Sequence, residues 1–123
     1  MNAKEYLKQI RLLDIQINYR LEEKEDLEWI SSRYPGISNR CKELAAGIDN
    51  VIRDLVNRKD EIIGKILLLK DHRYSDVLFL HYARYILLED VAAVMMKSNG
   101  KHYTFQHINR LHSEALNEIQ KII

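Results

Sequence analysis

Residues 38–70 read SNRCKELAAGIDNVIRDLVNRKDEIIGKILLLK, and this stretch decides the fold. One set of positions in it recurs at alternating steps of three and four residues. The set comprises Cys41, Leu44, Ile48, Val51, Leu55, Arg58, Ile62, Lys65 and Leu69. Most of these residues are apolar, which is typical of a long helix that pairs with another helix as in a coiled coil. Ser38 and Asn39 are the candidate N-caps.

A second long helix is predicted over residues 3–31, where Tyr6, Ile10, Leu13, Ile17 and Leu27 follow the same spacing. The segment SSRYPG at residues 31–36 separates the two helices, because proline disfavours helix at the residue before it and glycine tolerates turn geometry. Two helices of similar length joined by a short turn imply an antiparallel hairpin. We expect these residues to be buried against the first helix: Leu44, Ile48, Val51, Leu55 and Ile62.

The hairpin carries more apolar residues than one partner helix covers. The additional ones are Ile52, Ile63, Ile66 and Leu68. They call for packing against the rest of the chain, against a second copy, or against both, and we expect a homodimer through residues 1–70. The alternative is a plain spacer. Trp29 and Tyr34, near the turn, either form a partner site or pack together to close the turn.

Beyond residues 71–73 (DHR), three shorter helices are predicted at about residues 73–85, 88–97 and 104–122. The loop SNGKHY at residues 98–103 contains the strongest turn dipeptide of the chain, Asn99-Gly100. The chain is therefore expected to be all-α. Its two parts would be a coiled-coil-like hairpin over residues 1–70 and a smaller helical domain over residues 71–123.

The composition limits the function classes. The chain has 123 residues and a net charge of +1, so there is no overall basic signature for nucleic acid. The charge is nevertheless segregated along the chain. Residues 97–112 contain the cations Lys97, Lys101 and Arg110 and no acid, whereas residues 22–28 contain five acids and one lysine.

Residues that would carry catalysis or hold a metal are missing from the sequence pattern. Cys41 is the only cysteine, so neither an internal disulfide nor a thiolate metal cluster is expected. His102, His107 and His112 are five residues apart, which puts neighbours about 140° apart around a helix instead of on one face. We expect no enzyme activity, no metal and no cofactor. There is no signal-peptide core and no apolar run of membrane-spanning length, so a cytoplasmic protein without membrane contact is expected.

The last two predicted helices suit a helix-turn-helix. That motif needs a small residue where its helices cross and apolar residues on both inner faces. Val91, Ala92 and Met95 supply these on the first helix, and Ile108 and Leu111 supply them on the second. The same pattern occurs in other packed helix pairs.

Two resemblances favour the helix-turn-helix interpretation. The segment LEDVA at residues 88–92 resembles the first helix of the motif in region four of bacterial primary sigma factors. TFQHINRL at residues 104–111 with EAL at 114–116 resembles its recognition helix. Nearly the whole chain is similar to short phage and prophage regulators of Gram-positive bacteria, the autolysin and late-gene regulators. That similarity lies in MNAKEYL at residues 1–7, KDEII at 59–63, RLH at 110–112 and AL at 115–116.

The resemblance implies a sequence-specific DNA-binding transcription regulator in the bacterial host cell, acting as a dimer or with RNA polymerase. The residues implied at the DNA are Lys97, Lys101, Thr104, Phe105, Gln106, His107, Asn109 and Arg110. Among them, Gln106, Asn109 and Arg110 carry side chains suited to base edges, Phe105 suits a thymine methyl or the core, and Lys97, Lys101 and Thr104 suit phosphates. Thr104 equally suits a helix N-cap.

One departure from the sigma-like pattern is the loop at residues 98–103, which is six residues longer than the tight turn of the family and bears on the angle of the recognition helix. The alternative function is a protein-interaction module of sigma-like shape that binds and modulates, for example inhibits, a protein partner through its helical surfaces. Burial of Gln106 and Arg110 would favour this alternative.

Overall fold

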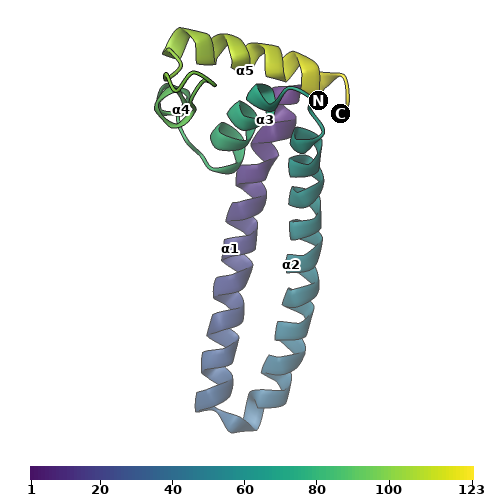
Figure 1. The fold of residues 1–123 in the computed structure, drawn as a ribbon. Coiled ribbons are helices and arrows are strands. Elements are labelled where there is room, and N and C mark those ends of the chain that lie inside the picture. Colours follow the sequence, from purple (N-terminus) through teal and green to yellow (C-terminus); the bar gives the residue numbers. More distant parts are fainter. The chain divides into compact units, whose positions relative to one another are not determined.

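The computed structural model describes residues 1–123 and is helical throughout (Figure 1). The elements are α1 (Ala3–Arg33), the 3₁₀ turn η1 (Pro35–Ile37), α2 (Ser38–Leu67), α3 (His72–Leu78), the π-helical turn η2 (Phe79–Ala83), α4 (Leu88–Val94) and α5 (Phe105–Gln120). The predicted all-α class is confirmed, and the only strand-like pairing is an isolated bridge between Met96 and His102. None of the helices combines the length and apolar composition that a bilayer crossing needs.

The chain divides into two compact units. Unit 2 consists of residues 12–60, and unit 1 consists of residues 1–11 together with residues 61–123. The predicted division at residue 70 follows the order of the chain. The structure instead groups the first turns of α1 and the last turns of α2 with the C-terminal helices, and Leu7, Ile10 and Ile66 of these segments are fully buried.

Unit 2 is an antiparallel helical hairpin, as predicted, in which α1 and α2 run side by side (Figure 1). Pro35 begins the 3₁₀ turn between them, and the hydroxyls of Ser31 and Ser38 are hydrogen-bonded at 2.7 Å across the turn. Two ion pairs cross between the helices. Lys24 Nζ lies 3.0 Å from Asp49 Oδ1, and Lys59 Nζ lies 2.6 Å from Asp14 Oδ1.

The seam of α2 is narrower than predicted. Ile48, Leu55 and Ile62 are buried, at seven-residue intervals that repeat one position of the heptad. Leu44 and Val51 are 42% and 39% exposed, so their predicted burial is wrong. The physical reason is that a single neighbouring helix covers one row of side chains completely and leaves the flanking row at the edge of the contact.

Unit 1 contains a three-helix core. Its buried members come from α3, α4, the residue that ends α4, and α5: Val77, Val91, Ala92, Met95, Ile108 and Leu111. The inner faces predicted for the last two helices are therefore confirmed. α5 lies across α3 (Figure 1), and the backbone N–H of Ala3 donates to Gln120 Oε1 at 2.7 Å, tying the start of α1 to the end of α5.

The four additional apolar residues of the hairpin differ in how far they are buried. Ile66 is fully buried within unit 1, and Ile52 and Ile63 are half-buried. Leu68 remains exposed in the segment after α2. Ile66 is thus unavailable to another chain, because its side chain already fills the core of unit 1.

The helix predicted over residues 73–85 is interrupted. α3 ends at Leu78 and continues as the π-helical turn η2, after which Tyr85 adopts a left-handed conformation with φ of 61°. The backbone N–H of Arg84 donates to the carbonyl of Phe79 at 3.1 Å, and that of Ile86 donates to the carbonyl of Leu80 at 3.0 Å. These bonds span five and six residues and close the wide π-helical turn. Sequence reasoning missed this ending because the left-handed position is held by tyrosine, not glycine.

A polar cluster joins η2 to α5. The hydroxyl of Tyr82 lies 2.8 Å from Nε2 of His112, and His81 packs edge-on against the His112 ring with centroids 5.5 Å apart. Burial raises the pKa of Tyr82 to about 12 and lowers the pKa of His112 to about 4, and the charges of His81 and Lys4 add to the effect on His112. The cluster is therefore built around a neutral imidazole.

This arrangement predicts a loss of stability in acid. The unfolded chain takes up a proton at His112 below about pH 6.5, whereas the folded chain resists it down to about pH 4. The neutral imidazole thus contributes stability above pH 6.5 that is lost as the pH falls toward 4. Between pH 7.5 and pH 5 we expect urea unfolding to report a loss of about 1–2 kcal/mol from this group, allowing for its partial exposure.

The variant His112→Gln should remove that part of the pH dependence. His102→Gln, which alters an exposed histidine in the same unit, should leave it intact. Equal pH dependence in the His112→Gln variant and the parent would contradict the assignment.

Candidate DNA-contacting surface

The surface to be tested as a DNA contact is the outward face of α5. Ile108, Leu111, Ala115 and Ile119 are buried on the opposite face. Because a helix repeats every 3.6 residues, burial of that stripe turns other positions outward. Gln106, Asn109 and Arg110 are all exposed, and the side chain of Arg110 is 67% exposed.

The start of α5 is defined by a cap. The hydroxyl oxygen of Thr104 accepts a hydrogen bond from the backbone N–H of His107 at 3.1 Å, so the N-cap prediction is confirmed. Phe105 is exposed and does not belong to the core, which removes the core alternative for this residue. The first turn of α5 therefore presents an aromatic ring and an amide side chain to solvent.

The long connection between α4 and α5 contains a tight turn at residues 97–101, which we call the 97–101 turn. The backbone N–H of Lys97 donates to the carbonyl of Lys101 at 2.8 Å, and the N–H of Gly100 donates to the carbonyl of Lys97 at 2.9 Å. Gly100 has φ of 81°, a left-handed conformation that glycine adopts without steric cost, and the Asn99 side chain accepts from the N–H of Lys101 at 3.0 Å. The predicted turn at Asn99-Gly100 is confirmed, and it places two lysines at the two ends of one turn.

Aromatic packing ties one of these lysines to α5. Lys97 Nζ lies 5.4 Å from the centre of the Tyr103 ring, and Tyr103 meets His107 edge-on with ring centroids 4.8 Å apart. A cation over an aromatic face is attracted by the ring quadrupole. The stack restricts Lys97 to the side of the 97–101 turn that lies next to the first turn of α5, whereas Lys101 is exposed.

Positive charge converges on this surface. The pKa of His107 is lowered, first by desolvation and then by the nearby charges of Arg110, Lys97 and Arg73. Arg110 belongs to α5, Lys97 to the 97–101 turn and Arg73 to α3. Arg73 was missed by sequence reasoning, because it lies far from the recognition helix in the chain and only folding brings it near.

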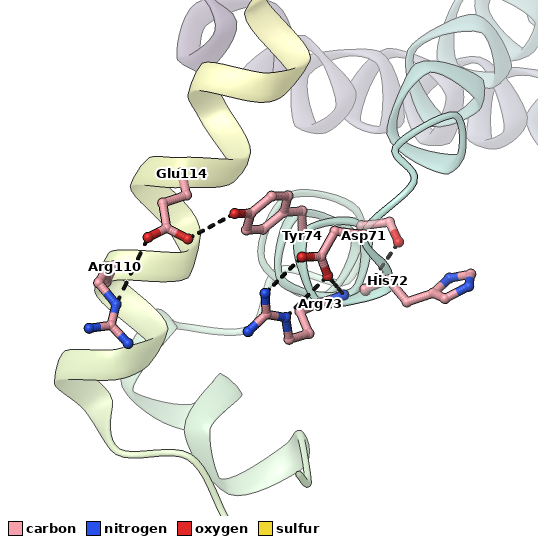
Figure 2. A network of polar contacts seen from close by, with 7 residues as sticks. Asp71, His72, Arg73, Tyr74, Arg110 and Glu114 are labelled. Atoms are coloured by element: carbon pink, nitrogen blue, oxygen red, sulfur yellow. Dashed lines mark hydrogen bonds and ion pairs between the residues drawn. The ribbon is translucent and has the colours of Figure 1, made fainter. Parts of the chain in front are cut away.

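Acidic side chains hold two of the cations in place (Figure 2). Arg73 makes a bidentate contact with Asp71, with Nε–Oδ1 of 3.1 Å and Nη2–Oδ2 of 2.8 Å, which lowers the pKa of Asp71. Arg110 Nε lies 3.9 Å from Glu114 Oε1, and Glu114 Oε2 accepts a hydrogen bond from the Tyr74 hydroxyl at 2.9 Å. Tyr74 of α3 therefore orients Glu114, which in turn biases Arg110 along the face of α5.

Every residue assigned to the site from the sequence lies between Lys97 and Arg110, in the 97–101 turn, the residues after it or the first two turns of α5. Comparison of the chain with protein-family models, with curated proteins and with solved structures gives no match. The chemistry of this surface and the sequence resemblance are therefore the two indications of function.

The left-handed conformation of Gly100 in the 97–101 turn leads to a prediction about stability. Gly100→Ala should lower the free energy of unfolding by about 1 kcal/mol, because an L side chain disfavours the left-handed conformation even where a Cβ has open space. Gly47→Ala is the matched control in the exposed interior of α2, where a Cβ also meets nothing. It should raise stability by about 0.5–1 kcal/mol through helix propensity. Urea unfolding followed by circular dichroism measures both, and stabilisation by Gly100→Ala would contradict the turn geometry.

Proposed function

We propose that the chain is a sequence-specific DNA-binding transcription regulator that inserts the outward face of α5 into the major groove. The observation that carries the proposal is the exposure of Gln106, Asn109 and Arg110 beside three convergent cations. A recognition helix needs polar side chains free on one face and a firm apolar anchor on the other. α5 has both.

The chemistry of the exposed side chains matches base recognition. Arginine pairs in a bidentate manner with guanine, and asparagine or glutamine pairs with adenine. Arg110, Asn109 and Gln106 would supply these contacts. Phosphates would be contacted by Lys97 and Lys101 of the 97–101 turn and by Thr104 and His107 at the start of α5. Phe105 would contact a thymine methyl group. Phosphate contacts of this kind set the register of the helix on the duplex.

The charge balance bears on how such a protein would act. The net charge is +1, and neutralised phosphates supply much of the affinity of a DNA-binding protein. A single copy would bind weakly. We therefore infer that a second copy or RNA polymerase assists binding, in keeping with the resemblance to sigma factors and to phage and prophage regulators.

A second candidate function rests on a separate observation. Trp29 and Tyr34 are both exposed near the turn of the hairpin, with Arg33 stacked over the Trp29 ring at 4.8 Å, so they do not pack together into a closed turn. Exposed aromatic residues are common anchors of protein interfaces. This observation favours a protein-interaction module in which the hairpin binds a partner.

The DNA-binding proposal predicts two different mutational effects. Arg110→Ala should cost about 1–3 kcal/mol at the specific site and relax the sequence preference, because it removes a bidentate base contact. Lys101→Ala should weaken binding to all sequences alike and reduce the slope of log K against log salt by about one. The measurement is fluorescence anisotropy over a salt series, with duplexes from upstream of the protein's own gene cluster and scrambled duplexes of equal length.

Arg40→Ala is the matched control. It also removes one exposed arginine and one helical ion pair, the contact of 3.4 Å between Arg40 and Glu43, but it lies in unit 2. It should leave DNA affinity unchanged. The DNA-binding proposal fails if Arg110→Ala and Lys101→Ala both bind DNA like the parent while substitution of Trp29 abolishes transcription regulation. The protein-interaction module then replaces it.

A further inference from the structure

The guanidinium of Arg110 is contacted along one edge only. Its Nε lies 3.9 Å from Oε1 of Glu114, which is one helical turn further along α5 (Figure 2). The terminal nitrogens Nη1 and Nη2 have no hydrogen-bond or ion-pair partner in the protein. These two nitrogens are donors that an arginine can direct end-on at the O6 and N7 acceptors of guanine. Glu114 therefore occupies the edge of the guanidinium that end-on recognition leaves unused.

Glu114 is itself held by a second element. Its Oε2 accepts a hydrogen bond of 2.9 Å from the hydroxyl of Tyr74, and the Tyr74 ring packs against the apolar core of unit 1. This hydrogen bond is the largest cause of the raised pKa of Tyr74, so the hydroxyl keeps its proton and remains a donor. The two oxygens of one carboxylate thus have different partners, Tyr74 on α3 and Arg110 on α5.

A cation beside Tyr74 is already engaged elsewhere. Arg73 Cζ lies 5.9 Å from the centre of the Tyr74 ring, but Nε and Nη2 of Arg73 donate to Asp71 at 3.1 and 2.8 Å. An ion pair between two exposed side chains of one helix contributes little by itself and does not fix an arginine. Here the hydrogen bond from Tyr74 limits the freedom of the carboxylate, and the contact of Arg73 with Asp71 leaves Glu114 to Arg110.

The geometry points to Tyr74 and Glu114 as positioning residues that determine the sequence specificity of α5. Glu114 holds Arg110 by its Nε edge, so that the two terminal nitrogens project together toward one guanine. The inference rests on the proposed function, and it adds which base Arg110 reads and which residues select that base. A carboxylate also repels phosphate, so the same contact disfavours a non-specific ion pair between Arg110 and the DNA backbone.

The first test measures base preference with the full chain and a pool of duplexes randomised in sequence, from which bound duplexes are recovered and sequenced. The parent should enrich guanine at one position where Arg110→Ala shows no enrichment. Tyr74→Phe keeps the ring in the core and removes only the hydroxyl. It should lower the enrichment of guanine at that position by about threefold to tenfold, as expected for coupled neighbours.

Glu114→Gln should lower the guanine enrichment to a similar extent. Because it also removes a negative charge beside the DNA, it should raise the affinity for scrambled duplexes. The two variants therefore affect specificity alike and affect non-specific affinity differently. Full guanine enrichment in both of them, with the helix content of the parent by circular dichroism, overturns the inference.

Glu118→Gln is the matched control for the loss of an acid. Glu118 lies on the same helix, is paired with Lys121 at 2.8 Å, and its side chain is 45% exposed, close to the 43% of Glu114. It should raise the affinity for all duplexes and leave the guanine enrichment unchanged. If Glu118→Gln lowers the enrichment as much as Glu114→Gln does, charge and not positioning is responsible, and the inference is rejected.

The second test needs no DNA and follows the NMR relaxation of the arginine Nε–H groups in the free protein. Arg40 is the internal reference, because its ion pair of 3.4 Å with Glu43 is made by two side chains that are each 70% exposed, and no third residue holds Glu43. The Nε–H of Arg110 should be more restricted than that of Arg40, and Tyr74→Phe should remove the difference. Equal mobility of the two groups in the parent contradicts the positioning role.

The proposed function and this inference can fail separately. A parent that enriches no sequence from the pool overturns both, because no specificity then exists to be determined. A different outcome is loss of guanine enrichment in Arg110→Ala together with full enrichment in Tyr74→Phe and Glu114→Gln. That result supports DNA reading by α5 and rejects only the role of Tyr74 and Glu114.

Discussion

The burial of Ile108 and Leu111 against Val77, Val91 and Met95 is the contact on which the arrangement of unit 1 depends. Once these two side chains enter the core, the helical period sets the orientation of every other residue of α5. Gln106, Asn109 and Arg110 then face outward without any further constraint. The same apolar contact that stabilises the domain therefore creates its candidate binding surface.

Polar contacts refine what the apolar core establishes. Tyr74 binds Glu114, which lies beside Arg110, and Tyr103 lies between Lys97 and His107. Each contact links α5 to a neighbouring element and limits the freedom of a cation. Long basic side chains lose conformational entropy when a ligand immobilises them, so partial ordering beforehand reduces that cost. The connection at residues 97–101 contributes in the same way, because its turn is closed by backbone hydrogen bonds.

The hairpin of unit 2 is governed by a geometric limit. Two helices in contact bury one row of side chains on each, and α1 and α2 both carry a second apolar row. Leu44 and Val51 show the consequence directly, since they continue the heptad pattern and yet remain exposed. An exposed row of this kind has a free-energy cost in water that a further helix would relieve.

Sequence periodicity alone determined the all-α class, the paired long helices, the turn at Pro35, the inner faces of the last two helices and the turn at Asn99-Gly100. Each of these depends on local spacing or on a single residue's backbone preference. The approach of Arg73 to His107, the contact between Tyr74 and Glu114, and the neutral environment of His112 were decided only by the tertiary structure. So was the exposure of Leu44 and Val51, because the heptad pattern shows which residues seek a partner helix but not how many helices are present to cover them.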